Sequence, residues 1–228
     1  NTVGVQSIVP TPAAMLRTQI DSIMSDVGCD AAKIGMVPDA HGIRTLAQAL
    51  HTHAIPFVVL DPVVTATTGT TLMEHSAAAV LLQELAPLST LITPNLPEAR
   101  LLAERNIESV DDMLEAAHTL QQRGASAVLV KGGHMPGDTL SDVLLLADGS
   151  EHVFTDTRID TRNTHGTGCT YSAAITALLP QHEHVPSAVR EAHAWLTRAI
   201  ARADELAVAG SPAGHGPVHH FHALWPTR

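Results

Sequence analysis

Cysteine is scarce in this sequence. The chain of 228 residues contains two cysteines, Cys29 and Cys169. Small secreted domains that depend on disulfides carry many more, so a disulfide framework is disfavoured and a reducing compartment is favoured. We therefore expect a cytoplasmic protein whose core is held together by packing.

Long apolar runs, an excess of positive charge and a Walker A motif are also missing. Gln, Glu or Pro interrupts every apolar run before it reaches the ~20 residues that a membrane-spanning helix needs. The formal net charge of −10 argues against a nucleic acid-binding surface, although a nucleotide bound with magnesium remains compatible with it. The lack of Gly-x4-Gly-Lys-Ser/Thr disfavours a P-loop enzyme. These absences leave a small molecule as the expected partner, without nucleic acid or membrane.

Short apolar runs alternate with amphipathic segments along most of the chain, and 45% of the residues are hydrophobic. This content suits one sizeable core, and we find no repeat or linker, so we expect a single domain over residues 1–228. Unbroken apolar strands separated by helices predict a mostly parallel sheet with helices on both faces, an α/β fold. Asp148-Gly149 between two extended runs predicts a late antiparallel hairpin. The expected strands are 32–36, 57–60, 88–93, 127–130, 143–146 and 153–155, and the expected helices are 12–27, 39–53, 77–85, 97–103, 109–124, 171–179 and 186–206.

The first of these helices is predicted from its start signal and its apolar stripe. Thr11 and Pro12 suit the N-cap and first helical positions. Leu16, Ile20, Ile23 and Val27 then recur at helical spacing, which predicts an amphipathic helix.

A glycine loop opens a helix at residues 163–174. Gly166 and Gly168 allow a sharp turn and a close approach to a ligand, and the first turn of the helix offers free N–H groups that favour an anion. Cys169 lies in this first turn, where the helix N-terminus is expected to lower the pKa of its thiol. The loop is therefore a candidate anion site with a candidate base or nucleophile. For an isolated Gly-x-Gly, an ordinary loop before a buried, inert cysteine is the better interpretation.

Polar residues follow three of the expected strands. Asp61 follows the second, Thr93 and Asn95 close the third with Glu98 one turn on, and Lys131 follows the fourth. Ligands of open α/β sheets bind beyond the carboxyl ends of the strands, so these side chains should converge there with the glycine loop. Acidic groups, an amide, a lysine and an anion site are what phosphoryl transfer from a magnesium nucleotide requires.

Each of these residues also has a simple structural interpretation. Asp61 suits a turn before proline, Lys131 a solvated strand end, and Glu98 a first helical turn. A hydrolase with Cys169 as nucleophile is an alternative, but His165 lies in the same loop and no other histidine is marked as its base. A binding protein without activity is the stronger alternative, and magnesium-dependent consumption of nucleotide distinguishes it from a kinase.

Five blocks resemble one family in its own order, across nearly the whole chain. The family is that of the bacterial hydroxymethylpyrimidine/phosphomethylpyrimidine kinases of thiamin synthesis, within the ribokinase-like superfamily. The resemblance implies a ribokinase-like fold, ATP and Mg²⁺ as cofactors, and a homodimer. The blocks are residues 61–63, 93–98, 131–134, 165–174 and 216–221.

The resemblance implies transfer of the γ-phosphate of ATP to 4-amino-5-hydroxymethyl-2-methylpyrimidine and to its monophosphate. A pyridoxal or pyridoxine kinase of the same superfamily is the alternative, because close relatives phosphorylate pyridoxal. The implied catalytic residues are Gly166, Thr167 and Gly168 of the anion loop, with Cys169 as base where sugar kinases carry an aspartate.

The resemblance also implies binding residues for the nucleotide, the metal and the acceptor. Thr93, Asn95 and Lys131 are assigned to the nucleotide. Asp61 and Glu98 are assigned to magnesium. The acceptor pyrimidine is assigned to Met36, Val63 and Cys169.

Two further expectations concern the ends of the chain. His215, His219, His220 and His222 form a weak metal signal, and packing of an ordinary tail is the better interpretation. Members of the family begin with a strand and a glycine-rich loop, followed by a helix and a second strand. We therefore expect the natural protein to carry roughly one βαβ unit ahead of Asn1, with part of the acceptor pocket in it.

Overall fold

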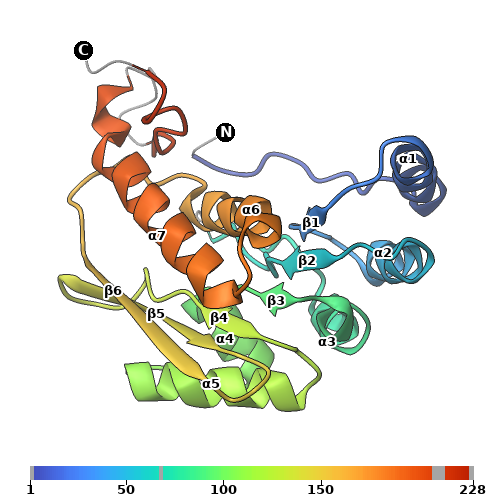
Figure 1. The fold of residues 1–228 in the computed structure, drawn as a ribbon, viewed down its shortest axis with the longest axis horizontal. Helices are drawn as coiled ribbons and strands as arrows, with labels where there is room; N and C mark the ends of the chain where they lie inside the picture. Colours follow the sequence, from blue (N-terminus) through green and yellow to red (C-terminus); the bar gives the residue numbers. More distant parts are fainter. Residues whose placement is uncertain (1–2, 67–68, 207–213, 226–228) are drawn as a thin grey trace.

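The computed structural model describes residues 3–66, 69–206 and 214–225. A six-stranded sheet lies between two layers of helices (Figure 1). The strands are β1 (Ala31–Ile34), β2 (Phe57–Leu60), β3 (Leu91–Ile92), β4 (Val128–Val130), β5 (Thr139–Leu145) and β6 (Glu151–Thr157). The helices are α1 (Ala13–Asp26), α2 (Ala40–Thr52), α3 (His75–Glu84), α4 (Leu96–Ala103), α5 (Val110–Gln122), α6 (Thr167–Leu178) and α7 (Val185–Ala201).

The strands lie in the order in which they occur in the chain. β1 to β4 are parallel neighbours, and β4–β5 and β5–β6 are antiparallel pairs. The turn of the β5–β6 hairpin contains Gly149, whose φ of 82° is easily adopted only by glycine. The predicted α/β fold, with its parallel sheet and late hairpin, is confirmed.

Alternation along the strands divides the core into two layers. Val58 and Leu60 of β2 pack with α2, α3, α4 and α5 on one face of the sheet, whereas Val59 packs with α6 and α7 on the other. All three side chains are at most 3% exposed. Because both faces are covered, β2 is apolar at every position, which is why the unbroken run Phe57–Leu60 predicted its bounds correctly.

The structure corrects several predicted boundaries. In α1 the N-cap is Pro12, and no residue of the helix is buried. Ile23 and Val27 are 56% and 78% exposed, so half of the predicted stripe does not pack. The start of the predicted strand 88–93 is instead a 3₁₀ turn at Ala86–Leu88. The predicted helix 186–206 ends at Ala201 and is followed by a 3₁₀ turn at Ala203–Glu205.

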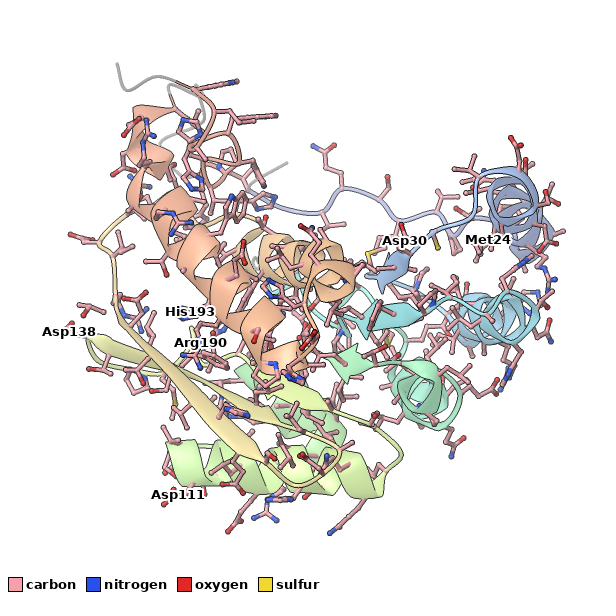
Figure 2. All side chains as sticks on the ribbon, in the orientation of Figure 1. Met24, Asp30, Asp111, Asp138, Arg190 and His193 are labelled. Carbon is pink, nitrogen blue, oxygen red and sulfur yellow. The ribbon has the colours of Figure 1, made fainter. Side chains whose placement is uncertain are left out.

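Helix α7 packs against the β5–β6 hairpin. Figure 2 labels Arg190 and His193 between α7 and the hairpin. The ring of Phe154 on β6 lies 6.1 Å from that of His193, and the Arg190 guanidinium lies 5.4 Å from the Phe154 ring centroid. These contacts fix the hairpin against the helical layer that carries the glycine loop.

Within the described ranges, no helix is both long enough and apolar enough to cross a bilayer.

Candidate active site

Asp61 is the centre of a buried polar cluster at the carboxyl ends of the parallel strands. The residue follows β2, its N–H donates to the carbonyl of Ile34 at 2.8 Å, and it is 1% exposed. Both carboxylate oxygens accept from other elements. Oδ1 accepts from Lys131 at 2.7 Å and from the Thr93 hydroxyl at 3.2 Å. The sequence predicted that Asp61, Thr93 and Lys131 converge, and the structure confirms it.

Two further side chains complete the cluster, and the sequence did not reveal either of them. The Oδ2 atom of Asp61 lies 3.2 Å from Nζ of Lys33 and accepts from the Ser172 hydroxyl at 3.0 Å. Ser172 lies on the buried face of α6, one turn beyond the glycine loop. A single carboxylate therefore ties β1, β2, β3, β4 and α6 together.

The cluster is charged at neutral pH. Burial disfavours ionisation of Asp61, but the nearby ammonium groups of Lys131 and Lys33 outweigh this effect and hold the pKa of the carboxyl below its ordinary value. Two cations around one buried anion leave one positive charge that Asp61 itself does not balance. Such a charge attracts an anionic ligand to the strand ends.

The glycine loop has the geometry of an anion site. Gly166 is the N-cap of α6 with a φ of 76°, and the Thr167 hydroxyl donates to the Thr164 carbonyl at 2.7 Å, which fixes the turn. The N–H groups of Gly168 and Cys169 have no acceptor among the described residues. A Cβ atom at Gly168 would lie 3.2 Å from Nζ of Lys131, so this ammonium faces the loop. The predicted anion site thus has both backbone donors and a cation.

The Cys169 thiol differs from its prediction. The thiol lies within the electrostatic influence of the Asp61 carboxylate. Burial and then the charge of Asp61 raise the pKa of the thiol above its ordinary value, although Lys33 and Lys131 oppose the change. The predicted lowering by the helix N-terminus is wrong, because burial of the thiol, and then the charge of Asp61 from 108 positions away in the sequence, raise its pKa instead. No histidine forms a hydrogen bond with the thiol in the part of the chain described, so the Cys–His pair of a hydrolase has no support.

Glu98 and Asn95 form a capping box at the start of α4. The Asn95 side chain accepts the Glu98 N–H at 2.9 Å, and the Glu98 carboxylate accepts the Asn95 N–H at 2.8 Å. Glu98 is 3% exposed. Burial raises the pKa of its carboxyl from 4.5 to about 7, and Lys131 and the Asn95 N–H only partly oppose this. Its charge therefore lacks full compensation from the protein.

The residues assigned to the acceptor do not share one cavity. Met36 is 44% exposed and lines a cavity of about 240 Å³ beside β1, together with Lys33, Gly35 and Asp39. We refer to it as the β1 cavity. Val63 is half-buried in the turn after Asp61 and does not line it. Cys169 does not line it either.

The C-terminal block 216–221 packs against the glycine loop. The carbonyl of Gly216 accepts the His165 N–H at 3.0 Å, and the His220 ring nitrogen lies 3.1 Å from the Thr170 hydroxyl. A largely apolar groove of about 600 Å³ runs from this junction between α6 and α7, and Cys169 lines it.

The histidines near the C-terminus pack as side chains of a folded tail. His219 and His222 are 3% and 4% exposed, and their rings contact Trp225 and Trp195 respectively. No metal-binding group of three or more His, Cys, Asp or Glu occurs over the described ranges. The packing interpretation is therefore the one that the contacts support.

Known proteins resemble this chain over nearly its whole length. A family model described as phosphomethylpyrimidine kinase matches residues 1–219. The hydroxymethylpyrimidine/phosphomethylpyrimidine kinase of Escherichia coli K12 is 44% identical over 226 residues, which cover 99% of this chain and 84% of the relative. The structure of pyridoxal kinase from Bacillus subtilis with ADP aligns with a TM-score of 0.83 and 34% identity, covering 95% of this chain and 79% of that one. A phosphomethylpyrimidine kinase from Clostridium difficile 630 aligns with a TM-score of 0.74 and 32% identity, over 88% and 81% of the two chains.

Proposed function

The chain belongs to the phosphomethylpyrimidine kinase family, and we propose that it transfers the γ-phosphate of ATP to hydroxymethylpyrimidine and to its monophosphate in thiamin synthesis. The observation that carries the proposal is the contact between the Asp61 cluster and the glycine loop. Lys131 joins the two, since its ammonium pairs with Asp61 and faces Gly168. Phosphoryl transfer depends on positioning and charge stabilisation, which this arrangement supplies.

On the donor side, the loop receives the transferring phosphate. The N–H groups of Gly168 and Cys169 and the N-terminus of α6 bind its oxygens, and Gly166 and Thr167 hold the loop in shape. Lys131 neutralises charge that develops as the bond from the γ-phosphorus to the bridging oxygen breaks. Asp61 keeps Lys131 extended toward the loop.

On the acceptor side, Cys169 is the base for the hydroxymethyl group. The sulfur lies at the loop that binds the γ-phosphate, so a hydroxyl oriented for attack there is within its reach. The raised pKa makes the thiolate a minor form at neutral pH but a stronger base once formed. The thiolate accepts the hydroxyl proton as the oxygen forms its bond to phosphorus. The β1 cavity and Met36 hold the pyrimidine.

Asn95 and Thr93, both assigned to the nucleotide, differ in whether their side chains have a polar group free to bind it. The Asn95 carbonyl oxygen is committed to the Glu98 N–H, which leaves its NH₂ group as a donor to phosphate. The Thr93 hydroxyl donates to Asp61 and is fully buried. We therefore expect Asn95 to contact the nucleotide and Thr93 to act through Asp61.

Of the two residues assigned to magnesium, Glu98 suits the role of a direct ligand and Asp61 does not. Glu98 carries a buried charge that the protein does not fully compensate, and a divalent cation would compensate it. Asp61 fits poorly as a direct ligand, because two ammonium groups and two hydroxyls already occupy its oxygens. When bound, Mg²⁺ would neutralise charge on the β- and γ-phosphates. Glu98 is the residue proposed to hold it.

Steady-state kinetics with two acceptors test the proposed function. We expect ATP-dependent turnover with hydroxymethylpyrimidine, and a kcat/KM at least tenfold lower with pyridoxal. Turnover of pyridoxal alone would favour the alternative vitamin kinase. The absence of ATP consumption with either acceptor would favour a binding protein. A homodimer and a cytoplasmic location belong to the same proposal, and sedimentation analysis and cell fractionation test them.

A further inference from the structure

The two acceptors of the proposed function present different nucleophiles, and this inference rests on that function. Hydroxymethylpyrimidine attacks through a hydroxyl, which must lose a proton. Its monophosphate attacks through a phosphate oxygen, and near neutral pH this group is already largely a dianion because its second pKa is about 6. In that step the acceptor oxygen forms a bond to the γ-phosphorus, and the bond to the bridging oxygen breaks with its electrons leaving on ADP. No proton has to leave the acceptor.

The second reaction therefore needs a cation more than it needs a base. A dianionic acceptor approaching a γ-phosphate is repelled by it, and only a nearby positive charge offsets this repulsion. Lys131 faces Gly168 and is 9% exposed in its side chain, so it serves the donor phosphate. A second protein cation that faces the acceptor would offset the repulsion on that side.

Lys33 is placed to be that cation. Its ammonium lies 3.2 Å from Oδ2 of Asp61, on the opposite carboxylate oxygen from Lys131. Unlike Lys131, its side chain is 22% exposed. An ammonium has three donors, and the single contact to Asp61 leaves donors available to a ligand.

The β1 cavity gives Lys33 access to the acceptor. Among the described residues that line the cavity, Lys33 is the sole cation and Asp39 the sole anion. The Asp39 carboxylate turns back to accept the Gly42 N–H at 2.7 Å as the N-cap of α2. Gly35 leaves room for the ammonium, since a Cβ atom there would lie 2.9 Å from Nζ of Lys33.

We propose that Lys33 binds the phosphate of the monophosphorylated acceptor and makes the second transfer possible, whereas Cys169 serves the first. Strand β1 thereby carries a residue, Lys33, that determines specificity for the second acceptor. Lys33 and Lys131 divide the two phosphates between them, with Asp61 holding both ammonium groups in place.

The test measures kcat/KM for both acceptors with the full chain. The ratio that is compared between variants is kcat/KM for the monophosphate divided by kcat/KM for hydroxymethylpyrimidine. Lys33→Met should lower kcat/KM for the monophosphate about 10- to 100-fold more than for hydroxymethylpyrimidine, the size expected for losing a charged hydrogen bond. Lys33→Arg should recover most of the ratio. Cys169→Ala should change the ratio in the opposite direction. Arg44→Met is the matched control, because it removes an exposed cation of α2 that pairs with Glu84 and should leave the ratio unchanged.

A second variant covers the case in which Lys33→Met fails to fold. Gly35→Ala keeps the charge but displaces the ammonium, and the backbone there is outside the left-handed region, so the alanine itself is tolerated. It should lower the ratio in the same direction. Equal losses on both acceptors in these variants would overturn the proposal, as Lys33 would then act only through Asp61. A wild-type protein that phosphorylates neither acceptor would instead overturn the proposed function.

Discussion

Replacing Glu98 by glutamine should make the protein more stable at high pH and not at low pH. The carboxyl is buried, and burial sets its pKa at about 7 against an ordinary value of 4.5. Since the pKa is raised in the folded state, the folded protein binds this proton more tightly than the unfolded chain does. The contribution of Glu98 to stability is thus undiminished below pH 4.5 and is lost as the pH rises through 7.

The magnitude follows from the two pKa values. A difference of about 2.5 pH units, at about 1.4 kcal/mol per unit, amounts to about 3.5 kcal/mol over the whole titration. Glutamine has no charge to bury, and its carbonyl oxygen still accepts the Asn95 N–H. The stability of Glu98→Gln relative to the wild type should therefore rise by about 3 kcal/mol between pH 4.5 and pH 8.

Urea denaturation with a chelator present, at several pH values across this range, measures the effect. Glu183→Gln is the control. Glu183 is exposed, so the stability difference between this variant and the wild type should not change with pH. A Glu98→Gln difference that is equally flat would refute the conclusion that this carboxylate is buried without full compensation.

Three other predictions concern the proposed base Cys169, the turn that follows Lys131, and the proposed magnesium site. Cys169→Ala should lower kcat about 10²–10⁴-fold with little change in acceptor affinity. In the wild type, kcat should keep rising to pH 9, because the pKa of the thiol is raised. A kcat that does not depend on pH, or full turnover in the variant that lacks the thiol, would exclude a thiolate base. Gly132→Ala should cost about 1–3 kcal/mol or more in urea denaturation, since its Cβ would lie 1.9 Å from the Ser141 carbonyl oxygen, whereas Gly133→Ala, with nothing within 4 Å, should cost little. Glu98→Gln should raise the magnesium concentration for half-maximal rate, and superimposable titrations would remove Glu98 from the metal site.

The sequence predicts the fold well where local signals and burial agree. Phe57–Leu60 is apolar throughout because both faces of the sheet are covered, and Asp61 then ends it. Ser109 with Asp112 forms the predicted capping box of α5. In α1 the apolar spacing predicts a helix correctly, but it does not show which apolar residues find a partner, and Ile23 stays exposed.

The candidate site is predictable only in part. Reading the residues that follow each strand finds Asp61 and Lys131. It misses Lys33, which lies within β1 and reaches Asp61 through a long side chain. It also misses Ser172, which resembles any small residue on a buried helix face. The pKa of Cys169 depends on burial of the thiol in the folded chain and then on the Asp61 carboxylate, which is distant in the sequence, so no local signal reveals it.

The proposed reaction requires the Asp61 cluster and the glycine loop together to move the γ-phosphate of ATP to a pyrimidine. Mass spectrometry of the products formed from γ-phosphate-labelled ATP and hydroxymethylpyrimidine follows this transfer. The label should appear first in the pyrimidine monophosphate and then in the diphosphate, and Lys131→Met should abolish both while the variant remains folded. Label that appears only as inorganic phosphate, with the pyrimidine unchanged, would contradict the proposed reaction.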